Sequence, residues 1–189
     1  MKEWSFYGNV TPPPENLSDT IEDNWQPPLF GELKCNIGIS WSKGKSLAGV
    51  SWVVRDYLSN VLFHRRRSYS QVYSCFDAKL KSWEWGLESM KSLHLEKVMF
   101  SATSMEIIKA IHNPKDWPAF VGHISPLLSM SKGMKHWFIL FEPAKCNIGA
   151  YEIAKSVTTD LRLSSYGATG YPNWLKKIFD KEKRNTVGI

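Results

Sequence analysis

The fold is decided by the stretch Leu33-Lys-Cys-Asn-Ile-Gly-Ile-Ser-Trp41. Apolar side chains alternate along it with polar or small ones, and this period of two is typical of a strand with one buried face. The alternation places Gly38 on the polar face. A glycine inside a strand indicates a bulge or the close approach of another backbone, and Gly49 in the next apolar run has the same meaning.

The pattern on either side of this strand predicts the remaining elements. Before it, prolines among acidic and polar residues disfavour regular structure. After it come strands at 48–55 and 61–69 and a helix from 76 to 90, with Ser74 and Asp77 as its capping box. A strand at 97–101 leads to a second helix, with Thr103 and Glu106 as its box. A helix over 120–130 despite Pro126, a strand at 136–141 and a final helix over 146–161 complete the pattern. This order, βββαβααβα, predicts an α/β (α+β) fold with helices on a mixed sheet.

The length of 189 residues favours one domain with tails. We expect an extended acidic, proline-rich lead-in over 1–30 and a folded domain over 31–163. From 164 onward regularity fades, which predicts an irregular basic C-terminal tail over 164–189. The stretch 175–184 within that tail could form a short amphipathic helix.

Charge and cysteine usage bound the function. The chain has a net charge of +6, but residues 1–24 carry one Lys against five acidic residues, so the remainder is at +10 and suits an anionic partner such as nucleic acid. Cys35, Cys75 and Cys146 are odd in number and widely spaced, which argues against disulfides and zinc and favours a reducing compartment. No apolar run reaches the length of a membrane span. We therefore expect an intracellular protein, in the nucleus or the cytoplasm, with no metal, no cofactor and no membrane partner.

Five segments in order resemble one known family. They are Trp25-Gln-Pro-Pro28 with Leu33–Gly38, Val53-Val-Arg-Asp56 with Ser59–Leu62, Phe76-Asp-Ala-Lys-Leu80, Val98–Ser104, and Asn147–Lys155. Together they resemble the plant ribonuclease H-like, retroelement-derived (reverse-transcriptase-like) domains, over roughly residues 25–175. The resemblance implies a ribonuclease H-like fold, with a five-stranded mixed sheet flanked by helices.

The same resemblance implies a metal-dependent ribonuclease activity, but this sequence lacks the carboxylates that such an activity needs. Members of the family hydrolyse the RNA strand of an RNA–DNA hybrid with two divalent metals held by four carboxylates. Those four positions fall on Gly38, Lys79, Thr103 and Tyr151, and none of them is acidic. We therefore predict a pseudoenzyme with no catalytic residues and no metal site.

Nearby acids offer an alternative, an active hybrid ribonuclease with relocated ligands. The candidates are Asp77, Glu142 and Glu152. Asp77 points about 200° around the helix from Lys79 and has the position of a cap, and Glu152 projects about 100° away from Tyr151. Both directions argue against a rebuilt site.

Nucleic-acid binding without chemistry has its own candidates. Lys79, with the hydroxyls of Thr103 and Tyr151, could contact a phosphate where the metals would lie; drift after loss of selection is the alternative. Strand alternation sends Arg65 and Arg67 to one face and Arg66 to the other, so the pair could bind phosphate or simply protect a sheet edge. Trp85, about 200° from the core residue Trp83, is a candidate for base stacking.

The sequence thus predicts a catalytically inactive ribonuclease H-like domain that acts as a nucleic-acid-binding or protein-interaction module. RNA, DNA, an RNA–DNA hybrid or a protein are the expected partners. A scaffold that binds only protein is the remaining alternative, because a fold does not determine function once its site is lost.

Overall fold

A computed structural model describes residues 24–187 apart from 133 and 135, so most of the predicted lead-in lies outside the described residues. The strands are β1 (Leu33–Ser42), β2 (Leu47–Arg55), β3 (Val61–Ser70), β4 (Lys97–Ala102), β5 (His136–Phe141) and β6 (Tyr166–Thr169). The helices are α1 (Cys75–Ser92), α2 (Met105–His112), α3 (Val121–Ser131), α4 (Ile148–Thr158) and α5 (Lys176–Val187). Within this range no helix is long and apolar enough to cross a membrane.

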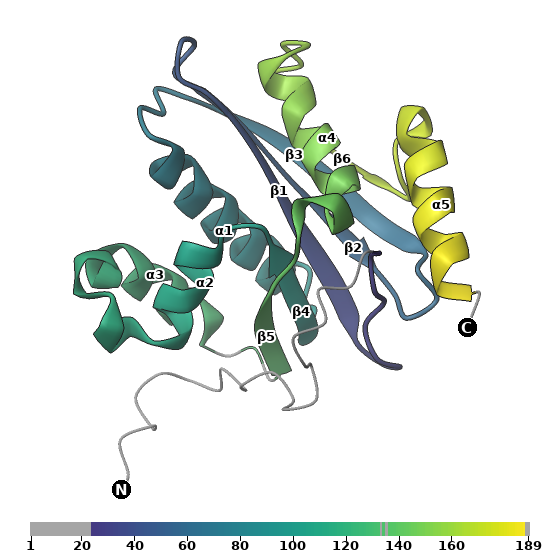
Figure 1. The fold of residues 1–189 in the computed structure, drawn as a ribbon, viewed down its shortest axis with the longest axis horizontal. Coiled ribbons are helices and arrows are strands. Elements are labelled where there is room, and N and C mark those ends of the chain that lie inside the picture. The colour runs from purple at the N-terminus through teal and green to yellow at the C-terminus, as the bar shows by residue number, and fades with distance from the viewer. Residues whose placement is uncertain (1–23, 133, 135, 188–189) are drawn as a thin grey trace, which may run out of the picture.

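The strands form one mixed sheet in the order β5-β4-β1-β2-β3-β6. β1 is central: it pairs antiparallel with β2 and parallel with β4, and β5 extends the parallel part. The predicted mixed sheet is confirmed, with a sixth strand added where β6 pairs antiparallel with β3. Helices cover both faces, with α1, α2 and α3 on one side and α4 and α5 on the other (Figure 1).

The two faces of the sheet differ in character. Beneath α1 the side chains are apolar and aromatic, and Trp52, Trp83, Phe100 and Trp137 are almost completely buried there. Beneath α4 and α5 the strands present mainly small and polar residues. The first face supplies most of the hydrophobic stabilisation, because stabilisation grows with the apolar area that is removed from water.

α4 lies unusually close to the second face because two glycines leave room for it. The backbone carbonyls of Ala150 and Ala154 occupy the space that a Cβ atom would need at Gly38 and at Gly49. Ser51 completes the contact by donating its hydroxyl to the Ala150 carbonyl at 2.5 Å. The prediction that these strand glycines mark close backbone approach is confirmed.

The helix starts agree with the sequence in one case and not in the other. Ser74 caps α1 and accepts the backbone N–H of Asp77 at 3.0 Å, as predicted. The predicted box of Thr103 and Glu106 is wrong, since Ser104 is the N-cap of α2 and makes no side-chain cap bond. The carboxylate of Glu106 is engaged instead by Lys79 on α1.

The segment predicted as an irregular tail is in fact ordered, which corrects the expected boundary at 163. β6 extends the sheet, and His64 on β3 contacts the Gly170 carbonyl through Nδ1 at 2.7 Å. α5 is the amphipathic helix that the sequence allowed for, and it buries Phe179, with Leu175 just before it, against α4 and β2. The short strand was missed because its residues 167–169, Gly-Ala-Thr, show no apolar alternation.

A buried polar network joins β1 to the segment that follows β5. Lys34 donates to Glu142 Oε1 at 2.7 Å and to the Gln26 carbonyl at 2.9 Å. Asn36 also donates to Glu142, and its own amide oxygen accepts the indole N–H of Trp25 at 2.8 Å. Burial raises the pKa of Glu142, and the charge of Lys34 offsets only part of that rise. Although residues 24–30 are irregular, Trp25 is therefore part of the folded body.

Arg55 extends this network to α5. Its guanidinium is 1% exposed and forms an ion pair with Glu182 at 2.6 Å. It also lies 4.2 Å from the ring centroid of Trp25 and 4.6 Å from that of Phe179. Burial lowers the pKa of Arg55 and raises that of Glu182, which shows that each charge depends on the other for compensation.

The glycine contacts predict a position-specific loss of stability. Gly38→Ala and Gly49→Ala should each lower the free energy of unfolding by about 1–3 kcal/mol, because the added methyl overlaps the backbone of α4. Gly44→Ala in the β1–β2 turn has open space around it and is the matched control. Urea midpoints measure the effect, and equal midpoints for all three variants would contradict the contact.

The ion pairs of α5 predict a contrast within one helix. Glu182→Gln leaves the buried Arg55 uncompensated and should cost about 3 kcal/mol of stability. Asp180→Asn removes the exposed pair with Lys176, whose Nζ–Oδ2 distance is 2.7 Å, and should leave the urea midpoint unchanged. A similar shift for both variants would mean that the Arg55 pair is not a buried anchor.

Candidate functional site

Three of the four positions that correspond to family carboxylates gather at one end of the sheet. Gly38 lies in β1, Thr103 directly follows the neighbouring parallel strand β4, and Tyr151 is in the first turn of α4. The register places Asn36 beside Ser101, so positions 38 and 103 follow at the same level. The Ala150 carbonyl beside Gly38 brings Tyr151 to the same end.

Gly38 is the most informative of these positions. A Cβ atom there would overlap the carbonyl of Ala150 and lie 2.5 Å from the Ser51 hydroxyl. No side chain of any size fits, and a carboxylate is much larger than a methyl group. This strand position cannot supply a metal ligand while α4 keeps its place.

Lys79 forms an ion pair with Glu106 across the α1–α2 interface. Their side chains are 24% and 36% exposed. Burial would raise the pKa of Glu106, but the hydrogen bond and the charge of Lys79 outweigh it and lower that pKa. The ammonium is therefore already neutralised at the contact between α1 and α2. Among the described residues, no direct contact joins it to Thr103 or Tyr151.

Tyr151 is exposed and Thr103 is half-buried. The ring of Tyr151 lies 5.7 Å from the ammonium of Lys155, one helical turn further along α4. The joint phosphate contact of Lys79, Thr103 and Tyr151 stays a prediction, and Lys79 would have to leave Glu106 to make it.

Each acid that could have replaced the lost ligands is paired with a lysine. Glu142 is buried with Lys34 in the network described above, Glu152 lies 3.3 Å from Lys155, and Asp77 lies 3.7 Å from Lys81. Nowhere in the described chain do three or more His, Cys, Asp or Glu side chains lie close enough to hold a metal ion. The acids stabilise the fold where they are.

The arginines of β3 alternate as predicted. Arg65 and Arg67 are exposed on the side of α1, whereas Arg66 is buried on the other side and donates to Ser156 Oγ at 3.0 Å. Arg67 and Lys81 lie 5.0 Å and 5.6 Å from the ring centroid of Tyr69. Arg65, two residues before Arg67 on the same face, lies 5.6 Å from the ring centroid of Trp52. We call Arg65, Arg67, Lys81 and Tyr69 the Tyr69 cluster.

The position of Trp85 corrects the sequence analysis. We expected it off the core face, but it is 9% exposed and its ring centroid lies 5.9 Å from that of Trp52. The reason is that α1 lies across several strands: Trp83 packs toward Phe100 on β4 and Trp85 toward Trp52 on β2, so residues far apart around the helix are both buried. Trp85 is a core residue and cannot stack on a base.

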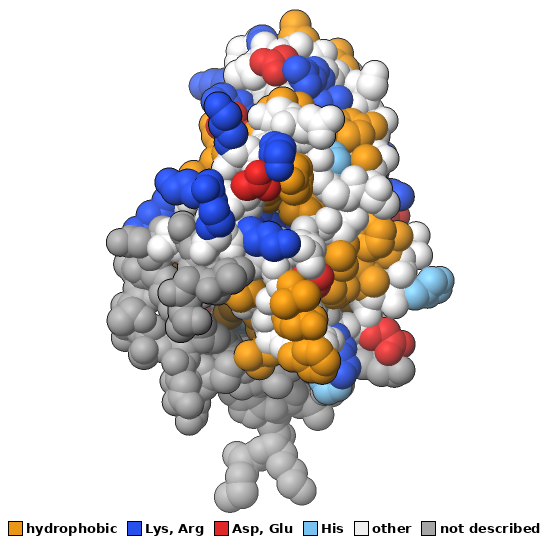
Figure 2. Space-filling model, turned by 90° about the vertical axis from the view of Figure 1, so that its right-hand side faces the viewer, with side chains coloured by type: hydrophobic (Ala, Val, Ile, Leu, Met, Phe, Trp, Pro, Cys, Tyr) orange, Lys and Arg blue, Asp and Glu red, His pale blue; other side chains and the backbone are white. Residues whose placement is uncertain are grey.

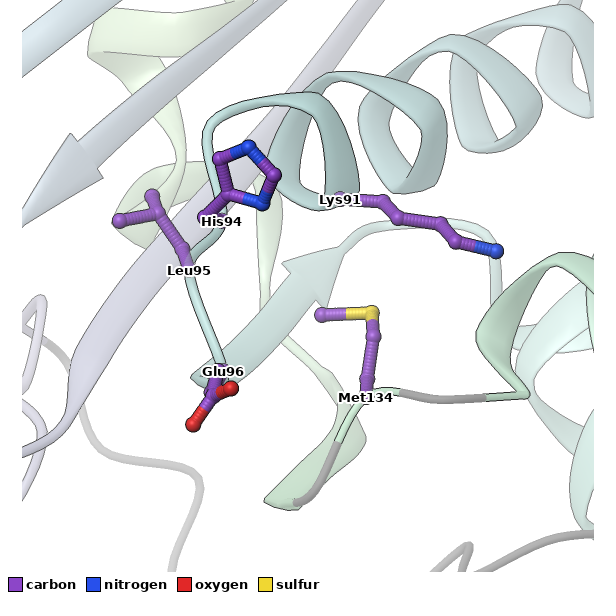
Figure 3. Close-up of a pocket in the computed structure, with 5 residues that line it drawn as sticks. All are labelled: Lys91, His94, Leu95, Glu96 and Met134. Atoms are coloured by element: carbon purple, nitrogen blue, oxygen red, sulfur yellow. The ribbon is translucent and has the colours of Figure 1, made fainter.

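A surface pocket lies at the other end of β4, away from these positions. It is lined by Lys91, His94, Leu95, Glu96 and Met134 (Figure 3). The side chains of Lys91 and Glu96 diverge, so the charged groups do not converge on one point. The pocket therefore adds nothing to the candidate site.

The sequence analysis missed a basic row on α5. The side of the molecule on which α5 lies carries Lys and Arg side chains across its upper and middle parts (Figure 2). Lys177, Lys181 and Arg184 follow the exposed Trp174 at helical spacing. That spacing is visible in the sequence, but the sequence analysis considered only the overall basic charge of the segment and not which residues share one face of a helix.

Comparison with known proteins supports the fold. The sequence matches no protein-family model and no curated protein. Among solved structures, ribonuclease H1 from the archaeon Halobacterium salinarum is 16% identical with a TM-score of 0.61, and the match covers 69% of this chain and 99% of that one. LC11-RNase H1, solved with an RNA/DNA hybrid, is 14% identical with a TM-score of 0.59 and the same coverage. The ribonuclease H domain of rv2228c from Mycobacterium tuberculosis is 16% identical with a TM-score of 0.54, and the match covers 68% of this chain and 96% of that one. The chain therefore has a ribonuclease H-like fold.

Proposed function

We propose that this chain is a ribonuclease H-like domain that binds nucleic acid without hydrolysing it. The observation that carries the proposal is Gly38, where the backbone of α4 fills the space of the strand carboxylate that metal-dependent hydrolysis needs. Lys79 supports it from the second position, since an ammonium cannot coordinate a metal ion and this one is already engaged by Glu106.

Retained binding is supported by charge and by surface geometry. Outside residues 1–24 the chain has a net charge of +10. In the Tyr69 cluster, Arg67 and Lys81 flank one aromatic ring and Arg65 lies on the same face of the strand, an arrangement suited to phosphate contacts beside a base or sugar. One structural neighbour was solved with an RNA/DNA hybrid, which makes a hybrid the natural first ligand.

A protein partner is the second candidate. Phe141, Ile148 and Tyr151 are 41%, 38% and 43% exposed. All three lie at the end of the sheet where the family would bind metal, and aromatic and aliphatic side chains of this kind are typical of the centre of protein interfaces. If a protein binds there, substitution of Phe141, Ile148 or Tyr151 should leave the affinity for polynucleotides unchanged.

The proposal predicts binding that depends on salt and is not followed by cleavage. Purified protein should bind a labelled RNA–DNA hybrid in the presence of Mg²⁺ or Mn²⁺, and the hybrid should stay intact on a denaturing gel. Arg65→Gln with Arg67→Gln should reduce the slope of log affinity against log salt by up to about 1.8, because each lost phosphate contact contributes about 0.9. Fluorescence anisotropy at several salt concentrations measures this slope.

The matched control is Lys109→Gln with Lys132→Gln, which makes the same charge change at two exposed lysines of α2 and the α3 end. An equal loss in both double variants would mean that only net charge matters. Metal-dependent cleavage that disappears in Glu142→Gln would establish the relocated-ligand enzyme and end the proposal.

A further inference from the structure

The outer side of α5 carries a row of cations that begins at an exposed tryptophan. Lys177, Lys181 and Arg184 are spaced i, i+4 and i+7, so they project within about 60° of one another. They point away from the buried side, where Phe179 packs. Trp174 precedes them by one turn, and we call these four residues the Trp174 row.

Trp174 is held in place but not covered. It belongs to a 3₁₀ turn, Asn173–Leu175, which leads directly into α5. The guanidinium of Arg162, from the loop after α4, lies 5.4 Å from its ring centroid. The residue is nevertheless 47% exposed. A large aromatic side chain that lies beside a cation and is open to solvent has the features of a stacking platform.

The acids of α5 act on only one end of this row, where Arg184 lies near Asp180 and donates to its backbone carbonyl at 3.3 Å. Asp180 is engaged by Lys176 and by the hydroxyl of Tyr171 at 3.0 Å. Glu182 faces inward to Arg55. Neither Lys177 nor Lys181 has an ion-pair partner among the residues that the structure describes. The outer face therefore presents a positive potential next to the aromatic ring.

We infer that the Trp174 row binds single-stranded RNA or DNA. A base stacks on Trp174, and Lys177, Lys181 and Arg184 contact the phosphates of the nucleotides that follow. A single strand is required because the bases of a duplex are stacked on one another and cannot reach the ring. The inference rests on the proposed function. It places a single-strand binding site on the opposite side of the sheet from the Tyr69 cluster.

A lipid surface is a poorer fit to the same residues. A helix that binds a bilayer inserts its apolar side below the headgroups. In α5 that side is already used, since Phe179 and the adjoining Leu175 are each 3% exposed and pack on Val53 and Ile153.

The test is anisotropy with labelled oligouridylate, oligothymidylate and a duplex, using the whole chain. Trp174→Ala should weaken binding of the single strands about tenfold, whereas Trp174→Phe should keep most of the affinity. Lys177→Gln with Lys181→Gln should lower the salt slope by about 1.4, because a phosphate contact on a single strand contributes about 0.7. Lys109→Gln with Lys132→Gln is the charge-matched control on the far side of the sheet, and circular dichroism confirms that each variant is folded.

The results distinguish the Trp174 row as a single-strand site from the broader proposal that the chain binds nucleic acid. Selective loss in the Trp174 and Lys177/Lys181 variants, with the control unchanged, supports the row. Single-strand binding that falls only with Arg65→Gln and Arg67→Gln overturns the row but leaves the proposed function standing. Failure of the native chain to bind any polynucleotide overturns both, as does exclusive binding to phosphatidylserine vesicles. A preference for uridylate over thymidylate, or the reverse, assigns the strand as RNA or DNA.

Discussion

The close approach of α4 to β1 and β2 is the constraint on which the rest of this structure depends. Gly38 and Gly49 meet the backbone of α4 at Ala150 and Ala154, so at these two points the helix backbone lies directly against the strands. Asn147, just before the helix, donates to the Ile37 carbonyl at 2.8 Å and holds the start of α4 against β1. α5 in turn packs beside α4, with Phe179 against Gly149, Ala150 and Ile153.

The two faces of the sheet then have different tasks. The α1 side is a conventional apolar core. The α4 side relies on backbone contact, hydroxyl groups and compensated charges, which cost desolvation energy and stabilise the fold only when every partner is in place. Glu142 is an example: it has the residue type of a catalytic acid, but Lys34 and Asn36 satisfy its oxygens.

Much of this fold follows from the sequence by simple periodicity. The alternation around Gly38, the cap at Ser74 and the apolar runs at β4 and β5 predict the sheet and its helices, and the motif spacing predicts the ribonuclease H-like arrangement. Trp85 shows the limit of this reasoning: helical angles give its direction but not that Trp52 on β2 lies there to cover it. Lys79 and Glu106 show another, since an ion pair between two helices depends on tertiary distances that neither local pattern contains. β6 is too short and too rich in small residues for any periodic signal.

The convergence on Arg55 has a consequence for the order in which the chain acquires its structure. Trp25 near the start of the described chain and Glu182 near its end both contact this one guanidinium. Contacts between residues so distant in sequence form late, because the loop between them must close first. During synthesis the sheet can assemble while α5 is still inside the ribosome, but Arg55 then lacks its ion-pair partner Glu182. The nascent domain therefore becomes fully native only after its last helix has emerged, and until then the polar face of the sheet is the part most exposed to wrong partners.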